Sequence, residues 1–333
     1  MNTFLLHLSR EHPTLPEAEA MACLQAEAPD RPVDSKGPGY IVVSLLQEEM
    51  EMVADRIALC HSVGRYLGGC PPDSLDRFLE RMSLPEGSIS VRVKRVEGGL
   101  PDLHPHPLAG RIGAVLAKDR EVDLETPDLE IRVLLSDRLM FFLNDRPVPR
   151  KLFEERKVGS RPYFSPISLH PKFARALVNL TRVRRGETLL DPFCGTGGVL
   201  MEASLIGARV MGSDLSPDMV EGARMNLRHF GAGSERLEVL DVGEIHRTFR
   251  EVDAVATDPP YGRSTSTNRE PLEGLYHRSI DSMARVLRPD GWMGVVVPTE
   301  CPEHPLLEER EGHLQRVHRS LSRRYCVFTR RSR

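Results

Sequence analysis

The sequence predicts an α/β protein built in two parts, an N-terminal α+β module and a C-terminal domain with a mostly parallel central sheet. Three observations carry that prediction. The chain has 333 residues, which at roughly 100–200 residues per domain suggests two domains. Strands and helices alternate regularly from residue 188 onward, whereas the first 150 residues mix them without that repeat. A charged stretch at 145–166, rich in proline, separates the two parts.

Composition excludes several classes of protein. With 40% apolar and 28% charged residues, the chain has the composition of a globular protein rather than a disordered one. No apolar run approaches the roughly 20 residues that a membrane-spanning helix needs. The six cysteines form no CxxC pair, which argues against a zinc ribbon and against a disulfide scaffold. We therefore expect a reduced, cytoplasmic protein that binds no membrane and no metal.

The strands of the N-terminal part are identified by alternation. From 88 to 96, apolar residues alternate with polar ones, and Arg92 and Lys94 fall on the same side. This pattern predicts a half-buried strand with a basic exposed face. The other elements expected here are a strand over 40–46, helices over 48–63 and 108–116, and a hairpin of two strands over 129–135 and 138–144.

The C-terminal part contains repeated strand–helix units, which imply a parallel sheet with helices on both faces. One helix carries clear end signals. Ser216 is a favourable N-cap, Pro217 suits the first helical position, and Gly231 suits the position after the helix. We expect strands over 188–191, 209–214, 236–241, 254–258 and 292–297, and helices over 198–206, 216–231 and 272–287.

A glycine-bearing turn follows the first of these strands, in the sequence Asp191-Pro-Phe-Cys-Gly-Thr-Gly197. Its glycines allow the backbone to approach a ligand closely, and the next helix begins there with free N–H groups. The turn lacks the lysine of a phosphate-binding loop, and the Asp191 carboxylate would repel a pyrophosphate. The next two strands also end in aspartate, at Asp214 and Asp241. Three carboxylates at one sheet edge suit a nucleotide-like ligand that carries a cation.

The fourth strand ends in a second motif, Asp258-Pro259-Pro260-Tyr261. The two prolines fix φ and have no N–H, so carbonyls there are free to accept hydrogen bonds. A carboxylate and a carbonyl together can accept both hydrogens of a planar amine, and Tyr261 can stack on the base that carries that amine. Positioning and electrostatics would then supply most of the catalysis. We expect Asp258, Pro259, Pro260 and Tyr261 to form the catalytic motif.

Residues 161–333 resemble the Rossmann-like, class I S-adenosylmethionine-dependent methyltransferases, and among them the enzymes that act on exocyclic amines of nucleic acid bases. By that resemblance Asp191 and the glycines line the methionine part of S-adenosylmethionine, Asp214 the ribose and Asp241 the adenine. Cys194 is expected to be a small buried residue rather than a nucleophile. The cofactor site implied by the resemblance comprises Asp191, Cys194, Gly195, Thr196, Gly197, Asp214, Leu215, Asp241 and Val242.

The upstream residues resemble a THUMP RNA-binding domain, on the segments 91–95, 112–115 and 122–133. Residues 164–178 and 258–264 extend the likeness over essentially the whole chain, to the archaeal tRNA guanine-10 N2-methyltransferases. That family implies tRNA as partner, no obligatory protein partner, and transfer of one or two methyl groups to a flipped guanine. The residues expected to contact RNA are Arg92, Lys94, Arg95 and Arg263. The expected domains are an α/β piece at 1–55, THUMP at 56–146, a linker at 147–165 and the methyltransferase domain at 166–333.

Two alternatives remain open from the sequence. The target could be another guanine, at tRNA position 6 or in ribosomal RNA, or the chain could be a non-catalytic RNA-binding adaptor. The arginines of the C-terminal segment are also ambiguous. From Gly312 to Arg333 there are seven Arg and no Asp or Glu, which is typical either of a phosphate-binding track or of the outer face of a terminal strand.

Overall fold

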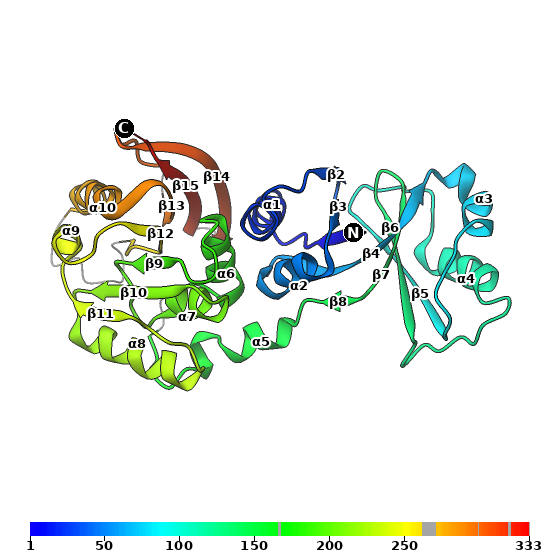
Figure 1. Ribbon diagram of the computed structural model, residues 1–333, viewed down its shortest axis with the longest axis horizontal. Coiled ribbons are helices and arrows are strands. Elements are labelled where there is room, and N and C mark those ends of the chain that lie inside the picture. The colour runs from blue at the N-terminus through cyan, green and yellow to red at the C-terminus, as the bar shows by residue number, and fades with distance from the viewer. Residues whose placement is uncertain (166–167, 262–270, 299, 319–320, 333) are drawn as a thin grey trace. The chain divides into compact units, whose positions relative to one another are not determined.

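The computed structural model describes the chain from residue 1 to 333 except for residues 166–167, 262–270, 299, 319–320 and 333 (Figure 1). It divides into two compact units that interleave in sequence. The first comprises Met1–Glu11, Ala28–Asp55 and Cys60–Val148, and the second comprises His12–Glu27, Arg56–Leu59 and Pro149–Arg333. In the part of the chain that the structure describes, no helix is long and apolar enough to cross a membrane.

The first unit is an α+β structure around one sheet of strand order β2-β3-β1-β4-β7-β6-β5, with β8 paired to β4. All pairs are antiparallel except β5 with β6. Helices α3 and α4 pack on one face through Leu75 and Ile112. The elements are β1 (Asn2–Leu8), β2 (Val33–Gly37), β3 (Tyr40–Leu45), α2 (Gln47–Arg56), β4 (Cys60–Cys70), η1 (Pro72–Ser74), α3 (Leu75–Glu80), β5 (Ile89–Arg95), α4 (Pro105–Leu116), β6 (Leu129–Leu135), β7 (Leu139–Leu143) and β8 (Arg146–Pro147).

Most expected elements of this unit are confirmed, and one is wrong. The alternating strand is β5, with Arg92 and Lys94 exposed, and the hairpin pairs Leu135 with Leu139. The helix expected over 48–63 ends at Arg56. Residues from Cys60 onward instead form β4, whose first residues pair with β1, because this apolar segment completes the sheet. The apolar spacing of the helix continues into a strand of similar hydrophobicity, so the sequence pattern alone does not separate the two elements.

The second unit has a sheet of order β11-β10-β9-β12-β13-β15-β14, parallel from β11 to β13 (Figure 1). This confirms the α/β fold with a mostly parallel sheet. Helices α6, α7 and α8 cover one face of the sheet, and α9 and α10 cover the other. The elements are α1 (Leu15–Glu27), α5 (Arg150–Glu155), η2 (Val158–Ser160), α6 (Pro171–Leu180), β9 (Thr188–Asp191), α7 (Gly198–Leu205), β10 (Arg209–Asp214), α8 (Pro217–His229), β11 (Arg236–Val239), η3 (Val242–Glu244), α9 (Ile245–Thr248), β12 (Val252–Thr257), α10 (Leu272–Val286), β13 (Leu287–Val297), β14 (Leu307–His318) and β15 (Leu321–Arg330).

The last two strands are antiparallel, and their direction decides where the C-terminal arginines lie. Strand β15 inserts between β13 and β14, with Trp292 opposite Thr329 and Val297 opposite Arg324. The first residues of β15 therefore lie at the edge where the parallel strands end. A disulfide joins Cys301 to Cys326 in β15. The expectation of a fully reduced chain is therefore wrong, because the sheet brings together two cysteines that are 25 residues apart in sequence.

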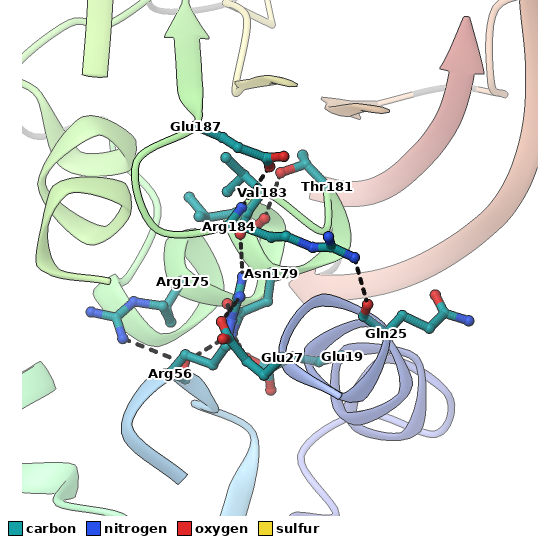
Figure 2. A network of polar contacts seen from close by, with 11 residues as sticks. Glu19, Gln25, Glu27, Arg56, Arg175, Asn179, Thr181, Val183, Arg184 and Glu187 are labelled. Carbon is teal, nitrogen blue, oxygen red and sulfur yellow. Dashed lines mark hydrogen bonds and ion pairs between the residues drawn. The ribbon is translucent and has the colours of Figure 1, made fainter. Parts of the chain in front are cut away.

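Helix α1 belongs to the second unit although it lies near the N-terminus. A buried polar network joins it to α6 (Figure 2). Asn179 donates to Glu19 at 2.7 Å and to the carbonyl of Arg56, and the Arg56 guanidinium donates back to Asn179 and pairs with Glu27. Backbone amides of Ala58 and Leu59 also donate to Glu19. Burial raises the pKa of Glu19 to about 7. The second unit thus includes two segments from the first 60 residues, His12–Glu27 and Arg56–Leu59.

Candidate active site

The candidate site begins where the sheet order reverses, between β9 and β12. Strands β9, β10 and β11 extend to one side of this point and β12, β13 and β15 to the other, and folds of this topology bind ligands beyond the carboxyl ends of the strands at such a point. Asp191 ends β9 and Thr257 ends β12. The Thr257 hydroxyl donates to Asp191 at 2.6 Å, and the Phe193 amide donates to it at 3.1 Å. The two motifs expected from the sequence therefore lie side by side.

The glycine turn has the backbone that only glycine adopts readily. Gly195 has φ +48° and Gly197 has φ +81°, and Gly197 is the N-cap of α7. A side chain at Gly197 would also lie 3.2 Å from Ala223 on α8. Cys194 is buried in the core below the turn, and burial raises the pKa of its thiol. Its sulfur therefore stays protonated and packs as an apolar group.

The glycine turn is also held by two side chains that the sequence analysis did not single out. Arg161 is buried and donates to the Thr196 hydroxyl at 3.3 Å. Asn226 on α8 is fully buried and donates to the Thr196 carbonyl at 3.0 Å. Asn226 also exchanges two hydrogen bonds with the backbone of Tyr163. The stretch around Arg161, expected to be a linker, thus reaches the ligand-binding turn.

The two later aspartates are each held by backbone amides. Asp214 accepts from Gly195 at 2.9 Å and from Ser216 at 3.0 Å, which orients both carboxylate oxygens. Asp241 accepts from Gly243 at 2.8 Å. A third side chain absent from the sequence-based set, Arg278 on α10, forms an ion pair with Asp241. The neighbouring Leu215 is exposed and Val242 is buried, so of the two only Leu215 presents an apolar surface to solvent.

Asp191 lies close enough to Asp214 and Asp258 for their charges to act on its carboxyl group. Burial raises the pKa of Asp191 to about 7, and repulsion from Asp214 and Asp258 adds to that rise. Burial likewise raises the pKa of Asp214. A cation near Asp191 would relieve both the burial and the repulsion that disfavour its charged form. A ligand with a sulfonium and an ammonium group fits that requirement, and a polyphosphate does not.

The second motif forms a compact acceptor group after β12. Burial raises the pKa of Asp258 to about 6, while a hydrogen bond from the Tyr261 hydroxyl opposes that rise. Tyr276 on α10 donates to the carbonyl of Pro260 at 2.9 Å, which fixes the loop from outside. In this state the Tyr261 hydroxyl therefore occupies one carboxylate oxygen of Asp258, a contact that the sequence motif alone does not indicate.

The expected RNA-binding residues lie in the first unit, apart from Arg263, which is outside the described residues. Arg92 is exposed and forms an ion pair with Glu130 at 3.2 Å, and Lys94 is exposed beside His61. The Arg95 guanidinium differs, because it donates to the carbonyls of residues 99, 100 and 103. A groove beside β5 is lined by Arg92, Lys94, His106 and Arg132.

Among the described residues, no group of three or more His, Cys, Asp or Glu side chains is arranged to hold a metal ion. The parts of the site that fit S-adenosylmethionine are the glycine turn and the carboxylates of Asp191, Asp214, Asp241 and Asp258. Cation and hydroxyl groups of that molecule would meet acceptors, and its uncharged adenine would meet Leu215.

Comparisons with known proteins agree with this geometry. Residues 158–326 match a family profile described as "RMKL-like, methyltransferase domain". The tRNA (guanine(10)-N2)-dimethyltransferase of Methanothermobacter thermautotrophicus is 37% identical, over 97% of this chain and 98% of its own. The enzyme of the same name from Pyrococcus abyssi is 35% identical, over 95% and 96%. The crystal structure of TrmN from Thermus thermophilus has the same fold, with a TM-score of 0.59 at 23% identity, covering 98% of this chain and 99% of that one. The chain belongs to the tRNA (guanine(10)-N2)-dimethyltransferase family of methyltransferases.

Proposed function

We propose that this protein transfers methyl groups from S-adenosylmethionine to the N2 amine of a guanine in tRNA, at position 10. The observation that carries the proposal is the placement of Asp258 and its two prolines directly after β12, whose last residue, Thr257, donates a hydrogen bond to Asp191 at the end of β9. An amine held at the first group would face a methyl group presented at the second. The names of the two full-length relatives support tRNA guanine N2 as the acceptor.

Bound S-adenosylmethionine would supply an electrophilic methyl group. The chain's own residues would make the amine attack it. The guanine amine is a weak nucleophile, since its lone pair is conjugated with the ring. The Asp258 carboxylate and a proline carbonyl would accept its two hydrogens and so direct the lone pair away from the plane of the base. After transfer the amine carries an extra proton, and the Asp258 carboxylate is the nearest base in the motif to accept it.

The same arrangement permits a second transfer, which the relatives' names support. A monomethylated amine still carries one hydrogen, which Asp258 can accept while the first methyl group turns toward the proline carbonyl. We therefore propose dimethylguanosine as the final product. Mass spectrometry of digested tRNA distinguishes the two products, since they differ by one methyl group, and a time course shows whether the monomethylated form accumulates first.

The first unit would grip the tRNA, as a THUMP domain does. The groove beside β5 contains Arg92, Lys94 and Arg132, with His106 opposite them on α4. Arginine and lysine in a groove suit phosphate oxygens, because each phosphate contact releases bound counterions. Base selection would then be left to the second unit, which contains the catalytic motif.

The test is methyl transfer to unfractionated tRNA, followed by mapping of the modified nucleotide. We expect incorporation into position 10, and none into a tRNA whose guanine 10 is replaced by adenine. Asp258→Asn is the matched inactive control. Methylation at position 6 or in ribosomal RNA would redirect the proposal to one of the alternative targets. Failure of any RNA to accept methyl groups would favour the non-catalytic adaptor.

A further inference from the structure

The C-terminal arginines do not form one continuous basic surface. Arg324 pairs with Glu300, and Arg330 donates to the carbonyl of Leu287. Arg323 differs from both, because it lies at the end of β15 that reaches the edge of the sheet where the parallel strands end, here called the catalytic edge. In the β13–β15 ladder its neighbour Arg324 lies opposite Val297, the last residue of β13. Only the antiparallel direction of β15 brings a residue so late in the chain to this edge.

The Arg323 guanidinium faces the catalytic motif. Its Cζ lies 5.9 Å from the centre of the Tyr261 ring, and its charge lowers the pKa of both Asp258 and Tyr261. Within the described part of the chain, its Nε is buried and has no hydrogen-bond partner. Successive residues of a strand point to opposite faces, so Arg324 and its partner Glu300 lie on the other side. Arg323 thus brings guanidinium donors close to the motif, in addition to the Tyr261 hydroxyl that donates to Asp258.

A guanine base matches this pair of groups along one edge. Its N2 amine and N1–H are donors, and O6 next to them is an acceptor. A carboxylate aimed at the donors leaves O6 in need of a donor beside it. The guanidinium is a common partner of guanine O6, because its N–H groups form a planar fork. Adenine would place a 6-amino group against the same donors and has no amine at position 2.

We propose that Arg323 determines the choice of guanine by donating to O6 of the target base while Asp258 holds the N2 amine. This rests on the proposed function, since it names the atom beside the amine that is methylated. The target base would stack on the Tyr261 ring. Asp258 would accept from its N2 amine, and the Arg323 guanidinium, which lies near the same ring, would donate to O6. Unpaired donors would disfavour a base that lacks O6.

The experiment compares two target bases in otherwise identical tRNA, guanine and 2-aminopurine at position 10. Both bases carry the N2 amine, but 2-aminopurine lacks O6 and the N1 proton, so it is the change of the preference in the Arg323 variants, rather than the preference of the parent, that reports on O6. The parent enzyme should prefer guanine in kcat/KM. Arg323→Ala should reduce that preference by roughly 10- to 100-fold, mainly through loss of activity on guanine. Arg323→Gln, which keeps a shorter donor, should lose less, and Arg324→Ala should leave the preference unchanged.

A second readout does not depend on turnover. Equilibrium binding of the two tRNAs is measured with S-adenosylhomocysteine present, and the preference for guanine should fall in Arg323→Ala but not in Arg324→Ala. Equal losses on both bases would overturn the proposal and leave Arg323 as a positioning residue for Tyr261, or as a phosphate contact. If the parent enzyme methylates neither base, the proposed function itself fails, which is a different result. Arg323→Gln keeps the test usable if Arg323→Ala does not fold.

Discussion

The two halves of the catalytic edge hold their carboxylates by different means. In the half formed by β9, β10 and β11, Asp191, Asp214 and Asp241 each accept a hydrogen bond from a backbone amide of the adjoining loops, to which Thr257 adds a side-chain contact at Asp191 and Arg278 one at Asp241. In the half formed by β12, β13 and β15, side chains surround Asp258, and they come from the motif itself, from α10 and from β15. Backbone amides cannot rotate away as side chains can, so we expect the first half to keep its shape when a cofactor binds and the second half to exchange side-chain partners when a base binds.

This difference predicts where substitutions separate binding from chemistry. Asp258→Asn keeps the shape of the side chain but removes its charge, so the amine loses its strongest acceptor. We expect the single-turnover rate to fall by ~10²–10³, or about 2.7–4 kcal/mol in the barrier. Affinity for S-adenosylmethionine, measured by calorimetry, should change little. A variant that methylates at nearly the parental rate would contradict the role given to Asp258.

The opposite pattern is expected in the other half. Asp214→Ala removes a half-buried acceptor that also orients the Gly195 amide. Cofactor binding should weaken by about 1.5–3 kcal/mol, the loss typical of hydrogen bonds to a charged group. Calorimetric titration with S-adenosylhomocysteine checks this without turnover. Asp218→Ala, an exposed aspartate on the helix that follows, is the matched control and should bind normally. Unchanged affinity in Asp214→Ala would show that the ribose site lies elsewhere.

The buried network behind α6 tests whether the catalytic unit needs its N-terminal helix. Asn179→Ala leaves Glu19 and Arg56 without a shared buried partner, and this should cost about 1–3 kcal/mol in the free energy of unfolding. Urea denaturation measures it, with Glu17→Gln on the same helix as a control. A fragment that starts at residue 161 lacks Glu19 and Arg56 altogether, so we expect it to be less stable still. A fragment as stable as the whole chain would show that the network contributes little.

The acidic residues of both halves are the part of the site that the sequence could predict. Asp191 and Asp214 each end a strand and Asp258 follows one, and strand ends are visible in hydrophobic patterns. Arg278 and Arg323 lie on a helix face and on an antiparallel strand, so only the tertiary fold brings them to the edge. Helix α1 was missed for a related reason. It is buried on most of its surface and carries Glu19 inside, so it lacks the amphipathic pattern of a surface helix.

The first unit offers a further contrast, because its contribution should depend on salt. Arg92→Ala combined with Lys94→Ala removes two exposed charges from β5. If both contact phosphate, tRNA binding should weaken, and the slope of log affinity against log salt should fall by somewhat under one unit per lost contact. Cofactor affinity should stay the same. Filter binding over a salt series measures the slope, with Arg111→Ala on α4 as the control. A slope equal to that of the parent would remove these residues from the RNA-binding surface.

The smallest expected effect concerns the pH dependence of the second half. Because burial raises the pKa of Asp258 to about 6, the carboxyl gains a proton below that pH and stops accepting from the amine. Single-turnover rates at saturating cofactor and tRNA should therefore fall about tenfold per pH unit in the acid range.

The hydrogen bond from Tyr261 and the charge of Arg323 both lower the pKa of Asp258. Nearby Asp191 also has a raised pKa. Tyr261→Phe should accordingly move the midpoint to higher pH. Tyr276→Phe, which loses only the bond to the Pro260 carbonyl, should leave it in place. A midpoint that is the same in the parent and in Tyr261→Phe would mean that the Tyr261 hydroxyl leaves Asp258 before the base is bound, so that the contact belongs to the resting enzyme alone.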